Sequence, residues 1–178
     1  MLLMISVVST AEAREAMMGG AGILDIKNPA EGSLGAQVPR IIREIKNIAS
    51  GSVEISAAIG DLPNLPGTAA LAALGAAVCG ADYVKAGLYG VRSEMEAIML
   101  LREVKDAVRQ FGSSIIAAGY ADFHRAGTLD PDCLPRAASL AGCSGSSYRC
   151  VVQSLIIFST SARGREYCAR EYATARSL

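Results

Sequence analysis

The first 141 residues alternate between short apolar runs and segments with helical character, and this alternation constrains the fold more than any other feature. Each run has the length and composition of a buried strand, and each following segment is amphipathic or rich in alanine. The predicted strands are Leu2–Val8, Gly22–Lys27, Val53–Ile59, Asp82–Ala86 and Ser114–Ala118. Strands that alternate with helices form right-handed βαβ units, so we expect an α/β fold with a parallel sheet.

Local signals place the helices. Ser9 with Glu12, and Ser93 with Glu96, have the spacing of capping boxes, in which side chains satisfy the backbone N–H groups that open a helix. The predicted helices are one that follows Ser9, Pro39–Ala49, Thr68–Cys79, Ser93–Phe111 and one that begins at Asp130–Pro131.

Polar residues end or follow the predicted strands, and their positions help to decide between an open sheet and a closed barrel. They are Asp25, Lys27, Asp61, Lys85, Tyr120 and Asp122. The carboxyl ends of the strands form the active-site face of a β/α barrel, so these side chains converge there. No G-x-G-x-x-G follows the first strand, which weakens a dinucleotide-binding reading. We therefore predict a TIM (β/α)8-type barrel, represented by about five β/α units.

Composition argues against several classes of partner. The formal net charge is zero, whereas nucleic-acid-binding proteins usually carry a basic excess. The most apolar stretch, Gly67–Ala81, is too short to span a membrane, and Met1–Val8 has the character of a strand and not of a signal peptide. The five cysteines show no C-x-x-C spacing, so we expect no metal site and a reduced, cytoplasmic protein.

Lys27 and Lys85 each stand at the end of a predicted buried strand. Burial lowers the pKa of a lysine and yields the neutral amine that attacks a carbonyl. Asp25 lies two residues before Lys27 and so faces the same side of the strand, where a carboxylate can stabilise an iminium. The structural alternative, in which each lysine pairs with Asp25 or Asp61, remains equally open from the pattern alone.

Four segments in the order of the chain give a specific resemblance. They are Asp25–Ala36, Ala58–Asn64 with Pro66–Thr68, Tyr83–Gly90 and Ala117–Phe123. Together they resemble the (5-formylfuran-3-yl)methyl phosphate synthase family, TIM-barrel lyases of methanofuran biosynthesis. The resemblance implies condensation of two molecules of glyceraldehyde 3-phosphate without a cofactor. It also implies that Lys27 forms a Schiff base, that Lys85 transfers protons and that Asp25 assists Lys27.

Other polar residues are candidates by position. We expect Asp61, Tyr120, Asp122 and Ser33 to bind a small phosphorylated aldehyde, although the Gly32–Gly35 segment that contains Ser33 is also typical of a simple turn. Another Schiff-base aldolase of the same fold, or an inactive fragment of the synthase, would carry the same lysines. A homo-oligomer is compatible with all three readings.

The character of the sequence changes after Gly142. Gly142–Ser147 is rich in Gly and Ser, Tyr148–Thr160 is β-like, and Arg163–Leu178 is Arg-rich and compatible with a helix. A complete barrel usually needs about 200 residues or more. We therefore expect residues 1–142 to form the barrel portion and residues 143–178 to be a divergent tail from a frameshifted or truncated reading. On that basis the chain as written should be unstable and weakly active.

Overall fold

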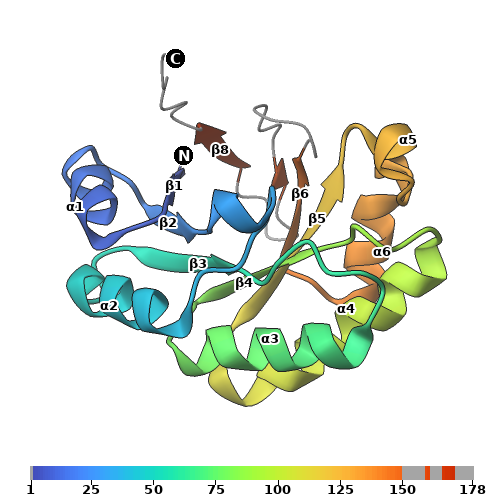
Figure 1. The fold of residues 1–178 in the computed structure, drawn as a ribbon, viewed down its shortest axis with the longest axis horizontal. Helices are drawn as coiled ribbons and strands as arrows, with labels where there is room; N and C mark the ends of the chain where they lie inside the picture. The colour runs from blue at the N-terminus through green and yellow to red at the C-terminus, as the bar shows by residue number, and fades with distance from the viewer. Residues whose placement is uncertain (1, 150–158, 161–165, 171–178) are drawn as a thin grey trace.

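A parallel sheet of six consecutive strands forms the body of the computed structural model, which describes residues 2–149, 159–160 and 166–170. The strands are β1 (Leu2–Val7), β2 (Ile23–Ile26), β3 (Glu54–Ala58), β4 (Tyr83–Gly87), β5 (Ser114–Tyr120) and β6 (Gly145–Arg149). Each strand pairs in parallel with the next one in the chain, and the sheet curls with helices around its outside (Figure 1). This arrangement confirms the predicted α/β organisation.

Six α-helices and three 3₁₀ turns lie among the described residues, and two of the helices begin directly after the predicted capping residues Ser9 and Ser93. The helices are α1 (Thr10–Met18), α2 (Pro39–Ala49), α3 (Pro66–Val78), α4 (Glu94–Val108), α5 (Phe123–Ala126) and α6 (Leu134–Ala141), with 3₁₀ turns η1 (Pro29–Glu31), η2 (Arg109–Phe111) and η3 (Pro131–Cys133). Ser93 and Glu96 form the complete capping box expected of them. Asp130 caps the turn η3, so the last predicted helix begins as a 3₁₀ turn and becomes α-helical at Leu134.

The end of the chain differs most from expectation. The sixth strand, β6, lies in the segment that the sequence had placed in the divergent tail. The helix expected over Arg163–Leu178 is wrong for Glu166–Arg170, which form β8, because these residues pair in parallel with the edge of β1. The short strand β7 (Ser159–Thr160) pairs antiparallel with β8. The remaining residues of the two predicted tail segments, apart from Tyr148 and Arg149, lie outside the described residues.

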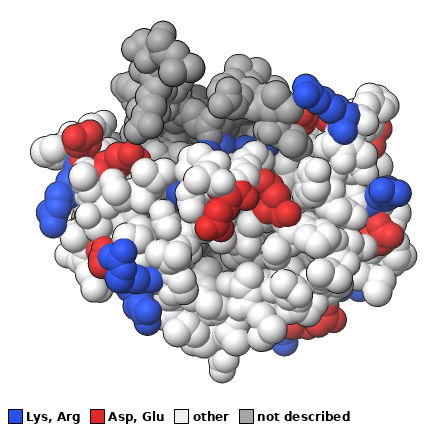
Figure 2. All heavy atoms as spheres, viewed as in Figure 1, with Lys and Arg blue, Asp and Glu red and all other residues white. Residues whose placement is uncertain are grey.

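Alanines bring the outer helices close to their neighbours. Helix α3 buries Ala69, Ala73, Ala76 and Ala77 and carries no charged residue, so the surface over it is uncharged (Figure 2). Small side chains on the buried face shorten the distance at which a helix packs. No helix in the described part of the chain is long and apolar enough to cross a membrane.

Helix α1 allows a matched test of this close packing. Ala13 is fully buried, whereas Ala11 on the same helix is exposed. We expect Ala13→Leu to lower the free energy of unfolding by about 1–3 kcal/mol, because the added carbons have no space. Ala11→Leu should change it by less than about 0.5 kcal/mol. Urea unfolding of both variants measures the difference, and equal effects would contradict the packing described here.

Candidate functional site

The carboxyl ends of the strands bring one carboxylate and several cations together inside the curled sheet. Asp25 on β2 stands level with Ser6 on β1 and with Ser56 on β3 in the strand register. Lys85 comes from β4 and Arg149 from the end of β6. Strand pairing therefore places on one face side chains that are up to 143 positions apart in the sequence, from Ser6 to Arg149.

Asp25 is the centre of this cluster, and both of its oxygens are bonded. Lys85 Nζ lies 2.7 Å and Ser56 Oγ 2.9 Å from Oδ1, while Arg149 Nη2 lies 3.1 Å and Ser6 Oγ 3.2 Å from Oδ2. Burial raises the pKa of the Asp25 carboxyl, but the charges of Lys85 and Arg149 and the hydrogen bonds from Lys85 and Ser56 outweigh it and lower the pKa to about 2. Asp25 is therefore ionised at neutral pH.

Lys85 is enclosed on all sides. Its side chain is 3% exposed, and Nζ contacts Met4 Sδ at 3.7 Å in addition to Asp25. Burial lowers the pKa of Lys85, and the adjacent Asp25 carboxylate opposes that change. The close pair with Asp25 allows Lys85 to hold or release a proton within the site.

Lys27 follows β2 directly and is also buried, at 6% exposure. Its backbone N–H donates to Val7 O at 3.2 Å, which extends the pairing of β1 with β2 up to the lysine. Burial lowers the pKa of Lys27 to about 8, the charges of Arg149 and Lys85 lower it as well, and those of Asp25 and Asp61 oppose them. A useful fraction of this amine is neutral near physiological pH, as attack on a carbonyl requires.

Three of the four predicted substrate-binding residues lie together in a second cluster. Asp61 accepts hydrogen bonds from Ser33 Oγ, at 3.3 and 3.4 Å from its two oxygens, and from the Tyr120 hydroxyl. Burial, and then the charge of Asp61, raises the pKa of Tyr120, so this hydroxyl stays protonated. The polar atoms of Ser33, Asp61 and Tyr120 are thus bonded to one another.

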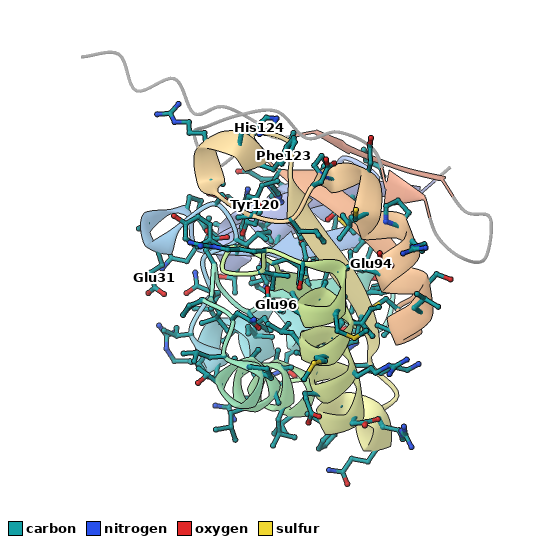
Figure 3. All side chains as sticks on the ribbon, turned by 90° about the vertical axis from the view of Figure 1, so that its right-hand side faces the viewer. Glu31, Glu94, Glu96, Tyr120, Phe123 and His124 are labelled. Atoms are coloured by element: carbon teal, nitrogen blue, oxygen red, sulfur yellow. The ribbon has the colours of Figure 1, made fainter. Side chains whose placement is uncertain are left out.

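The fourth of these residues, Asp122, follows β5 two residues after Tyr120. It occupies the N-cap position of the short helix α5 and is half-buried. His124 on the same helix is exposed, and its ring stacks on Phe123 with centroids 3.9 Å apart, whereas Tyr120 lies deeper (Figure 3). His124 is therefore a surface residue.

Three members of the cluster around Asp25 were missed from the sequence: Ser6, Ser56 and Arg149. Ser6 and Ser56 become visible only when the register of three strands is known. Arg149 was missed because the predicted barrel portion stopped at Gly142. Among the residues that the structure describes, no group of three or more His, Cys, Asp or Glu side chains is arranged to hold a metal ion.

Comparison with known proteins identifies the relatives of this chain. A family model described as 4-HFC-P synthase matches residues 3–147. A (5-formylfuran-3-yl)methyl phosphate synthase of Methanococcus maripaludis strain C7 is 52% identical over 145 residues, which cover 80% of this chain and 61% of that protein. The Archaeoglobus fulgidus protein of the same name is 54% identical over 145 residues, covering 80% of this chain and 62% of that protein. The chain thus spans about three fifths of the length of these relatives.

Solved structures share the fold at low sequence identity. A 2,3-dimethylmalate lyase of the PEP mutase/isocitrate lyase superfamily has a TM-score of 0.61 at 18% identity, covering 80% of this chain and 56% of that chain. A dihydrodipicolinate synthase has a TM-score of 0.60 at 14% identity, covering 78% of this chain and 52% of that chain. The TIM-type barrel class is confirmed, here as a curled six-strand part of one.

Proposed function

The chain belongs to the 4-HFC-P synthase family, and from that premise we propose that it carries out the Schiff-base chemistry of (5-formylfuran-3-yl)methyl phosphate formation in methanofuran biosynthesis. Two molecules of glyceraldehyde 3-phosphate supply the carbon atoms. One phosphate and two water molecules leave, so the atoms balance without an oxidant or a reductant. We propose a cytoplasmic location, where such phosphorylated sugars are available.

The buried amine of Lys27 is the observation that supports this proposal. A neutral amine attacks the aldehyde carbon and loses water to give an iminium, which draws electrons from the neighbouring carbon and allows it to attack the second aldehyde. The pKa of Lys27, about 8, provides that amine near neutral pH. The proposed lyase activity needs no metal or organic cofactor for this step.

Lys85 and Asp25 have supporting roles in this proposal. Lys85 donates and accepts the protons of the later dehydration and phosphate elimination, since its amine is held 2.7 Å from a carboxylate. Asp25 offers negative charge to the cationic iminium and keeps Lys85 oriented. Asp122 keeps the role predicted from its position, as a contact of the phosphorylated substrate.

The assay follows product, phosphate and adduct together. The purified chain is first shown to be folded by its secondary structure and is then incubated with glyceraldehyde 3-phosphate. Furan absorbance, free phosphate and the mass of the protein are recorded. We expect one phosphate to be released for each furan aldehyde that forms. A folded chain that forms an adduct with a different aldehyde only would indicate another aldolase. A folded chain that forms neither adduct nor furan would overturn the proposal.

Adduct formation should depend on pH in a way set by Lys27. Since the amine reacts only when neutral, the rate should rise through about pH 8 and level off above it. Arg149→Met removes a charge that lowers the pKa of Lys27, so the rise should move to higher pH in that variant. Stopped-time borohydride trapping across pH 6 to 10, on the order of two units either side of the pKa, measures both curves. An unshifted curve in the variant would contradict this account of the site.

A further inference from the structure

The cluster around Asp61 ties together three separate parts of the site. We call residues 28–35, which follow Lys27, the β2 loop. Asp61 lies after β3, and besides Ser33 and Tyr120 it accepts a hydrogen bond from the backbone N–H of Leu34 at 3.1 Å. Tyr120 is the last residue of β5. One carboxylate therefore fastens the β2 loop to two other strand ends.

The surrounding glycines fit this arrangement. Gly32 has a φ of 133°, and a Cβ added there would lie 2.4 Å from Asp61 Oδ2. A Cβ at Gly87 would lie 2.9 Å from both the Tyr120 hydroxyl and Leu34 Cδ1. A side chain at either position would displace Asp61 or its donors, so the backbone leaves space for this cluster.

Packing and internal bonds make the β2 loop a single unit. Leu34 is fully buried in an apolar group with Ala58, Ala118 and Tyr120. At the base of the loop, the backbone N–H of Asn28 donates to Gly35 O at 2.8 Å, so the two ends of the loop are joined beside Lys27. A shift of the loop at Ser33 and Leu34 is therefore transmitted to the backbone that carries Lys27.

We propose that Asp61 is a positioning residue, which holds the β2 loop against β3 and β5 and thereby fixes the place of the Lys27 amine. The bonds between Asp61, Ser33 and Tyr120 make these side chains a latch on the loop. This inference rests on the proposed function only in taking Lys27 as the reacting amine. The charge of Asp61 also raises the pKa of Lys27 against the effect of burial, which couples the latch to the reactivity of the amine.

The test uses two readouts that need no substrate. Hydrogen–deuterium exchange reports the Leu34 amide, and competitive labelling with acetic anhydride across pH reports the pKa of Lys27. Asp61→Asn should speed exchange at Leu34 by roughly tenfold or more and lower the pKa of Lys27, because a charged acceptor is lost. Ser113→Ala is the matched control, since it removes a hydroxyl that donates to Ala81 O at 2.8 Å near the amino end of β5. It should change neither readout.

Tyr120→Phe separates the effect of losing a hydrogen bond to Asp61 from the effect of losing the charge of Asp61. It removes one bond of the latch and leaves the Asp61 carboxylate, so exchange at Leu34 should quicken while the pKa of Lys27 does not fall. Ser33→Ala gives the same pattern and serves if Asp61→Asn fails to fold. Unchanged exchange at Leu34 in these variants would overturn the inference. Because labelling proceeds without aldehyde, a failure of Schiff-base formation is distinguishable from a failure of the latch.

Discussion

Asp25→Asn is expected to lower the free energy of unfolding by about 3–5 kcal/mol at neutral pH. The variant keeps the shape of the side chain but removes the charge that Lys85 and Arg149 share, at 2.7 and 3.1 Å. Both cations are at most 6% exposed, so neither can turn to water for compensation. Breaking a buried ion pair by removing one partner leaves an uncompensated charge, which is the costly case. Urea unfolding followed by circular dichroism measures the change.

Ser56→Ala is the control for this result. It removes one hydrogen bond to Asp25, of 2.9 Å, and leaves all charges in place, so we expect a loss of about 1 kcal/mol. Equal losses in Asp25→Asn and Ser56→Ala would contradict the central role given to the charge.

Acid titration of the unmodified chain tests the same charge. The pKa of Asp25 in the folded chain, about 2, is below its ordinary value. The stability that Asp25 contributes is therefore fully present above that ordinary value and is lost as the pH falls towards 2.

Lys27→Met should lower the formation of furan aldehyde from glyceraldehyde 3-phosphate by roughly a thousandfold or more, to the background of the assay. Lys27 supplies the amine at the end of β2, and the methionine that replaces it has no nucleophilic nitrogen. The same change should leave the chain as stable or more stable, since it removes a buried amine whose pKa is lowered mainly by burial. Loss of activity with retained stability separates a functional lysine from a structural one.

Lys46→Met is the matched control for that prediction. Lys46 on α2 also pairs with a carboxylate, Asp82, at 2.7 Å, but its side chain is 30% exposed and the pair lies outside the site. A partly exposed pair contributes little, so this variant should keep the conversion rate within about twofold. Comparable loss in both variants would show that the assay responds to general damage and not to the amine at residue 27.

Much of the fold was predictable because its signals are local. The helix expected over Pro39–Ala49 has those bounds, and the five predicted strands match β1 to β5 to within two residues at each end. Buried apolar runs and capping side chains depend on neighbours in the sequence, so a single chain displays them. The strand β6 escaped prediction because Gly145–Tyr148 contains glycine and serine where a buried strand usually has branched apolar residues.

The site was predictable only in part. Asp25, Lys27 and Lys85 stand at strand ends, where parallel topology alone makes them converge. Pairing with a carboxylate is shown for Lys85, which lies 2.7 Å from Asp25, whereas the functional reading of both lysines stays a prediction. The hydrogen bonds of Ser6 and Ser56, and the latch at Asp61, depend on register and loop packing that no local pattern displays. The division at Gly142, and the frameshift suggested there, stay predictions.

Reductive trapping shows whether the amine of Lys27 is the one that bonds to the aldehyde. The chain is mixed with glyceraldehyde 3-phosphate at about pH 8, reduced with borohydride, digested and sequenced by mass spectrometry. We expect the reduced three-carbon phosphate adduct on the peptide that contains Lys27, and we expect no such adduct in Lys27→Met. An adduct on Lys85 or on surface lysines, with the residue 27 peptide unmodified in a folded chain, would contradict it.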